Sequence, residues 1–186
     1  MKRHAHITIK YYPAAILLLL LLSGCQKSMV NNQSQHILFQ YEYLDDLNGV
    51  HQGFYIDDEG AVFVYNNPDE WNFHLDDYNF SISEEQIAEN LSKCVKSELY
   101  IETDKLAKFS GHITKIISSK ITATKKGNRE TGKTVFICYD YSESTEMYKG
   151  GLIKMEGSYS CENLNFFSKR ISAWLKEVNN SISNNN

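Results

Sequence analysis

The sequence predicts an α+β protein: a curved antiparallel sheet with helices packed mainly on one of its faces, and an amphipathic helix at the C-terminal end. Three observations lead to this fold class. Short runs of alternating apolar and polar residues indicate strands, glycine-containing turns join neighbouring runs, and separate segments repeat their apolar residues at helical spacing.

The first three strands are expected to form a meander. Residues 37–44 alternate, and the turn residues that follow end at Gly49. Strands are then expected over 50–57 and 61–65, separated by a second turn that contains Gly60. The apolar face of this meander is expected to carry Phe39, Tyr41, Phe54, Ile56, Val62 and Val64.

Two helices are expected after the meander. Ser83 and Gln86 have the spacing of a capping box, and apolar residues recur behind them at helical spacing as far as Val95. This pattern predicts a helix over 84–97. A shorter helix is expected over 103–109.

The remaining elements differ in how clearly the pattern defines them. The apolar residues of the segment 113–124 fit the spacing of a helix as well as that of a strand. Their β-branched side chains favour a strand from Ile116 onwards. A hairpin is expected from 135–141 and 147–155, which are joined by a polar turn. An amphipathic helix is expected over 165–178, with one apolar stripe that requires a sheet to cover.

The N-terminal segment has the parts of a secretory signal. Basic residues precede nine uninterrupted apolar residues, 14–22, whereas a membrane-crossing helix needs about 20. The run ends in Leu22-Ser23-Gly24-Cys25, which resembles the lipobox of bacterial lipoproteins. The resemblance implies cleavage after Gly24 and lipidation of Cys25, with enough acyl chains to hold the chain stably on a membrane.

This resemblance sets the expected domain organisation. Residues 1–24 are the signal peptide, 25–35 a flexible tether, 36–178 a single α+β domain and 179–186 a disordered tail. The domain is expected outside the cytoplasm, on the cell membrane or the outer membrane. Gln26 resembles the outer-membrane sorting signal, and the last third of the chain resembles small envelope lipoproteins.

Charge and motif spacing exclude several kinds of partner. Loss of the signal removes three basic residues and no acidic one, so the net charge falls from −4 to −7, which disfavours nucleic acid. Residues 127–134 match the phosphate-binding pattern GxxxxGK[ST], but the residues after Thr134 resemble a strand rather than the required helix. We therefore expect no nucleotide and no cofactor.

Cysteines, histidines and carboxylates give no clear metal or catalytic set. After lipidation of Cys25 three cysteines remain; Cys94 is expected on a helix face, which leaves Cys138 and Cys161 as the better disulfide pair. Paired aspartates at turns lack calcium-loop order, and scattered histidines lack metal-ligand spacing. No metal site is expected.

The segment 71–80 interleaves aromatic and hydrogen-bonding residues. Such residues suit a sugar or peptide surface, although the same aromatics can instead cover the core. The candidate binding residues are Trp71, Phe73, His74, Asp76 and Tyr78. We expect a non-catalytic binding or accessory domain for an envelope protein or glycan; the alternative is an envelope hydrolase that uses His74 with Asp76 or Asp77.

Overall fold

The computed structural model describes residues 36–72 and 79–185, which form one compact unit. Its strands are β1 (Ile37–Asp45), β2 (Val50–Asp57), β3 (Ala61–Asn66), β4 (Asn79–Ser83), β5 (Val95–Tyr100), β6 (Lys125–Lys126), β7 (Lys133–Ser142), β8 (Met147–Gly157) and β9 (Tyr159–Glu162). The helices are α2 (Glu84–Ser92), α3 (Thr103–Ser110), α4 (Ile113–Ile117) and α5 (Ser168–Asn185). None of the helices in these residues is long and apolar enough to cross a membrane.

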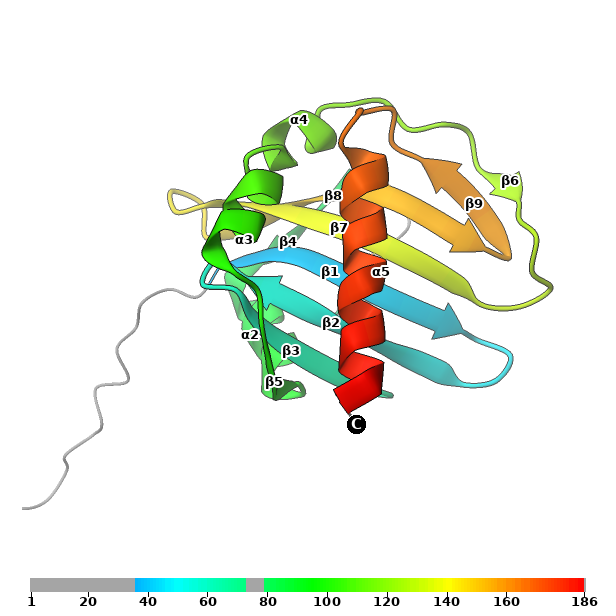
Figure 1. Cartoon of the computed structure of the whole chain (residues 1–186), viewed down its shortest axis with the longest axis horizontal. Helices are drawn as coiled ribbons and strands as arrows, with labels where there is room; N and C mark the ends of the chain where they lie inside the picture. Colours follow the sequence, from blue (N-terminus) through cyan, green and yellow to red (C-terminus); the bar gives the residue numbers. More distant parts are fainter. Residues whose placement is uncertain (1–35, 73–78, 186) are drawn as a thin grey trace, which may run out of the picture. The chain divides into compact units, whose positions relative to one another are not determined.

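All strand pairs are antiparallel and belong to one nine-stranded sheet. Its order is β5-β3-β2-β1-β7-β8-β9-β6, and β4 pairs separately with β8. The predicted antiparallel α+β architecture with a C-terminal helix is therefore confirmed. Figure 1 shows α5 crossing in front of the strands, with α2 behind them.

The predicted meander and hairpin are both present. Tyr41 in β1 lies opposite Phe54 in β2, and Phe54 lies opposite Val64 in β3, so the three central strands share one register of apolar residues. The β7–β8 hairpin is longer than predicted at both ends.

One face of the sheet, here called the apolar face, packs against α3, α4 and α5. The strand residues of this face are Phe39, Phe54, Ile56, Val62, Phe136, Cys138 and Ile153. Leu106 of α3, Ile116 of α4 and Trp174 of α5 are all at most 4% exposed against them. Tyr41 and Val64 pack at the margin, so the six residues predicted to share a face do so.

The opposite face, here called the mixed face, is also buried but holds polar groups. Its strand residues include Ile37, Tyr55, Tyr65, Val135, Ile137, Tyr139, Tyr148 and Leu152. Ile87 of α2 packs against them, and buried Gln40 lies among them with its side-chain amide donating to the Tyr65 hydroxyl at 3.0 Å.

Two predictions of secondary structure, one of a helix and one of a strand, were partly wrong. The capping box of α2 is present, with Gln86 N donating to Ser83 Oγ at 3.2 Å, but the helix ends at Ser92 and the chain then forms β5. Residues 113–117 form α4 instead of leading into a strand. Spacing of three and four residues puts Ile113, Ile116 and Ile117 on one helix face, and their burial outweighs the weak helix propensity of isoleucine.

The end of the chain also differs from the prediction. α5 continues to Asn185, through most of the segment 179–186 that was predicted to be a disordered tail. Ile182 lies one turn beyond Val178 and is only 7% exposed, so the apolar stripe of α5 extends further than the polar composition indicated.

Candidate functional site

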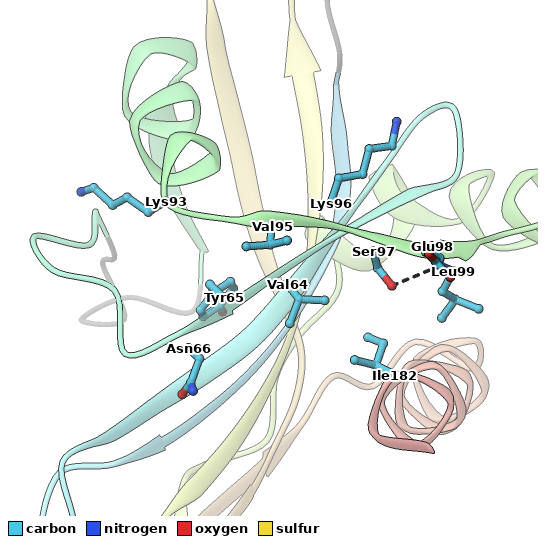
Figure 2. Close-up of a pocket in the computed structure, with 10 residues that line it drawn as sticks. All are labelled: Val64, Tyr65, Asn66, Lys93, Val95, Lys96, Ser97, Glu98, Leu99 and Ile182. Atoms are coloured by element: carbon cyan, nitrogen blue, oxygen red, sulfur yellow. Dashed lines mark hydrogen bonds between the residues drawn. The ribbon is translucent and has the colours of Figure 1, made fainter. Parts of the chain in front are cut away.

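An open groove lies where the edge strand β5 passes the last turns of α5, as Figure 2 shows. This groove, the edge groove, has a volume of about 580 Å³, within the range typical of ligand sites. Its lining residues come from β3, β5, the end of α2 and α5: Val64, Tyr65, Asn66, Lys93, Val95, Lys96, Ser97, Glu98, Leu99 and Ile182.

The edge strand is open because β5 is the terminal strand of the sheet order. Its pairing with β3 is regular at Val95 and Lys96 and shifts before Tyr100. Ser97 lies within this irregular stretch, and its hydroxyl accepts from the Leu99 backbone N–H at 3.1 Å. Such bulges limit edge-to-edge stacking of copies, while the straight part of the strand keeps backbone groups available for pairing.

The surface of the groove combines an apolar floor with a basic rim. Val95 is 73% exposed and gives the groove an apolar side chain that solvent reaches. Figure 2 shows Leu99 and Ile182 on the same side of β5, with Lys96 pointing away from them. Lys93 and Lys96 outnumber Glu98, so this surface is locally positive on a chain whose net charge is negative.

Both lysines are positioned by neighbouring groups. Lys93 Nζ donates to the Glu70 backbone carbonyl at 2.5 Å, a contact that leaves its charge unneutralised. Lys96 Nζ lies 5.8 Å from the centre of the Phe63 ring, a cation–π arrangement that also preserves the charge. The edge groove therefore offers backbone pairing, apolar contact and positive charge along one short strand.

A second cluster of interest lies on the mixed face, where a carboxylate and an imidazole meet. Glu42 Oε1 lies 2.6 Å from His51 Nε2, and the glutamate side chain is fully buried whereas the histidine side chain is 21% exposed. Burial raises the pKa of Glu42, and the hydrogen bond from His51 partly opposes that rise. The imidazole, and not the carboxylate, is the member of this pair that solvent reaches.

Trp71 is the one predicted binding residue that falls within the described part of the chain. Its half-buried ring packs on the mixed face, with ring centres 4.2 Å from Tyr65, 5.6 Å from Tyr55 and 5.5 Å from His51. Asn72 N donates to Asn90 Oδ1 at 2.9 Å and fixes the chain beside it. The other predicted residues, Phe73, His74, Asp76 and Tyr78, lie outside the described residues, as does Asp77.

The cysteines predicted to pair are not brought together. Cys138 belongs to the apolar face and its thiol contacts the Gly151 carbonyl at 3.6 Å, whereas Cys161 packs with the mixed face. Because the sheet separates the two side chains, this geometry does not support the expected disulfide. Cys94 follows the end of α2, and burial raises the pKa of its thiol to about 12.

The phosphate-loop match forms a different structure. Lys133 and Thr134 begin β7, so a strand follows the loop, as predicted, in place of the helix N-terminus that a phosphate-binding loop uses. Gly132 has a φ of +71°, and a Cβ there would lie 2.4 Å from the Tyr43 hydroxyl. The glycine of the motif is therefore explained by backbone conformation and by packing against Tyr43.

The turn carboxylates serve the local backbone. Asp45 Oδ1 accepts from Asn48 N at 3.2 Å, and Asp57 Oδ1 accepts from Ala61 N at 2.7 Å. Among residues 36–72 and 79–185, no group of three or more histidine, cysteine or carboxylate side chains is arranged to hold a metal ion.

The sequence did not predict the edge groove, because Val95 continues the helical spacing that starts at Ile87 and was assigned to the helix over 84–97. The competing signal was the alternation of Val95, Ser97 and Leu99 with charged residues, which has the period of a strand.

Comparison of the chain with protein-family models, with curated proteins and with solved structures finds no match.

Proposed function

We propose that this chain is a lipid-anchored envelope lipoprotein, and that its domain is a non-catalytic binding module for a partner protein. The anchor is supported by Leu22-Ser23-Gly24-Cys25 after a short apolar run. The binding role is supported by one observation above all, the edge groove with its open strand and exposed Val95.

The occupant is an extended segment of the partner that pairs with the straight part of β5. In strand addition, main-chain hydrogen bonds give affinity and pockets for alternate side chains give specificity. Here Val64, Leu99 and Ile182 supply the apolar pocket. Lys93 and Lys96 favour acidic residues at the other positions of the segment.

The binding test uses the mature lipidated chain in detergent and a displayed library of short peptides. Selection is expected to enrich extended sequences in which apolar and acidic residues alternate. Val95→Asp places a charge on the exposed strand and is expected to weaken the selected peptides about tenfold or more, a loss of about 1.4 kcal/mol or greater. Tyr159→Asp is the matched control, because Tyr159 is 54% exposed on β9.

Either of two results would contradict the peptide site. One is a selection with no enrichment over the unselected library. The other is a set of selected peptides that bind the Val95→Asp and Tyr159→Asp variants equally well.

The anchor is tested separately. Mass spectrometry of the natural product is expected to find Cys25 as the first residue, with its thiol and its amine both acylated. A Cys25→Ser variant is expected to leave the membrane fraction. An unmodified Cys25 thiol in membrane-purified protein would exclude this form of anchoring.

A further inference from the structure

An open polar pocket, here called the polar cavity, lies between α5 and the strands β1, β2, β7 and β8, and it shares no lining residue with the edge groove. Its volume is about 330 Å³, at the small end of the range for ligand pockets. β1 and β2 contribute Tyr41 and Gln52, the loop before β7 contributes Arg129, β8 contributes Glu156, and α5 contributes Lys176 and Asn180.

The aromatic wall of this cavity is held in place by the apolar face. The Tyr41 ring is parallel to Phe54 at 5.3 Å between centres and edge-on to Phe136 at 5.5 Å. Burial raises the pKa of Tyr41, and its hydroxyl is hydrogen-bonded to Thr134. The cavity therefore has a fixed ring and a protonated phenol in its lining before any ligand arrives.

The charged wall is organised around Glu156. Its carboxylate accepts from Lys176 at 2.5 Å and from Lys154 at 3.0 Å. Burial alone would raise the pKa of Glu156, but these two ammonium groups lower it below the ordinary glutamate value. Glu156 and Lys176 therefore form an ion pair that largely neutralises both charges within the cavity.

Arg129 supplies the remaining charge. It is exposed, and it takes part in none of the ion pairs found in the described part of the chain. The cavity therefore carries one excess positive charge. A guanidinium in this position can bind a carboxylate through two parallel hydrogen bonds.

We propose that this cavity binds an acidic saccharide unit. The solvent-facing part of the Tyr41 ring gives an apolar contact for the C–H groups of a sugar. The side-chain amides of Gln52 and Asn180 can donate hydrogen bonds to its hydroxyls and accept hydrogen bonds from them. Arg129 binds the sugar carboxylate. The proposal is independent of the peptide groove, because no residue is common to the two sites.

The same loop explains why a phosphate-binding sequence pattern occurs here without a phosphate-binding structure. Gly132 leaves room for the Tyr43 ring, and Tyr43 and Arg129 both line the cavity. The glycine-rich stretch thus shapes one wall of the saccharide site.

The test is calorimetric titration of the mature lipidated chain with oligogalacturonate, using neutral galacto-oligosaccharide and inorganic phosphate as comparison probes. Oligogalacturonate is expected to bind saturably. Arg129→Gln is expected to weaken its binding about tenfold or more, since a charge-assisted hydrogen bond is lost. Gln52→Ala is expected to weaken it by a smaller factor, because it removes neutral hydrogen bonds.

Both variants change exposed side chains, so the fold is expected to survive. Arg170→Gln is the matched control, because Arg170 is an exposed arginine on the first turn of α5, outside the cavity lining. The proposal is overturned if oligogalacturonate does not bind, if Arg129→Gln binds as tightly as Arg170→Gln, if the neutral sugar binds equally well, or if phosphate alone displaces the oligosaccharide.

Discussion

Phe39 and Gln40 are neighbours in β1 and both are completely buried, yet they belong to opposite faces of the sheet. Phe39 lies on the apolar face, where its ring is edge-on to Trp174 at 5.3 Å between centres. Gln40 lies on the mixed face, where its side-chain amide donates to Tyr65 and its side-chain carbonyl accepts from Tyr139. The two faces are thus buried with different chemistry.

This difference shows how each face achieves its stability. On the apolar face, most buried side chains are hydrocarbon, so packing against α5 decides the energy. The buried indole N–H of Trp174 has no hydrogen-bond partner in the described part of the chain. On the mixed face, each buried polar group needs a partner, and Asn90 of α2 accordingly donates to the Tyr55 hydroxyl at 3.2 Å. Truncating a side chain of the apolar face leaves a cavity. Removing a polar group of the mixed face leaves its buried hydrogen-bond partner unpaired.

The largest effect is expected from opening the apolar face. Trp174 is 2% exposed and stacks on Phe109 with 4.6 Å between ring centres. Trp174→Ala is expected to lower the free energy of unfolding by about 3–5 kcal/mol, as measured by urea denaturation. The control is Phe166→Ala, because Phe166 is 71% exposed, and its change is expected to stay within about 0.5 kcal/mol. Equal losses in the two variants would contradict the role of this face.

A smaller loss is expected on the mixed face. Tyr139→Phe keeps the ring but removes the hydroxyl that donates to the Gln40 side chain, which leaves a buried carbonyl oxygen without that donor. The expected cost is about 1–3 kcal/mol in the same assay. Tyr159→Phe removes an exposed hydroxyl and is expected to cost nothing measurable. If Tyr139→Phe also left the free energy of unfolding unchanged, the buried polar contacts would not determine the stability of the mixed face.

The contrast between the faces also explains which parts of the fold the sequence predicts. The apolar face follows from local alternation, since Phe54 and Ile56 are apolar residues two positions apart in β2. Gln40 and Glu42 alternate in the same way, but a polar residue in a strand is ordinarily assigned to solvent. Their burial depends on partners from distant elements, such as Tyr139, and local periodicity carries no information about such contacts.

The candidate sites were less predictable than the fold for a similar reason. The edge groove depends on where α2 ends, and Val95 fits the helical and the strand period equally. The polar cavity gathers Gln52, Arg129 and Asn180 from elements far apart in the chain. Only Trp71, from the segment 71–80, was selected in advance and can be placed, and it packs against Tyr65.

The subtlest expected effect is a change in pH dependence on the mixed face. Burial raises the folded-state pKa of Glu42 above its ordinary value of 4.5. The folded state therefore keeps the proton over a pH range in which the unfolded state releases it. The contribution of Glu42 to the free energy of unfolding is therefore expected to be largest below about pH 4.5. It is expected to fall as the pH rises from there through the raised pKa of the folded state.

Glu42→Gln removes this titration, so the stability of the variant relative to wild type is expected to rise across that window. Urea denaturation at a series of pH values measures the difference, and carboxyl carbon NMR of the wild type follows Glu42 directly. Parallel stability curves for the two proteins would show that Glu42 titrates alike in the folded and unfolded states. The fully buried carboxylate beside His51 would then resemble a surface group in its energetics, and burial on the mixed face would not disfavour its charged form.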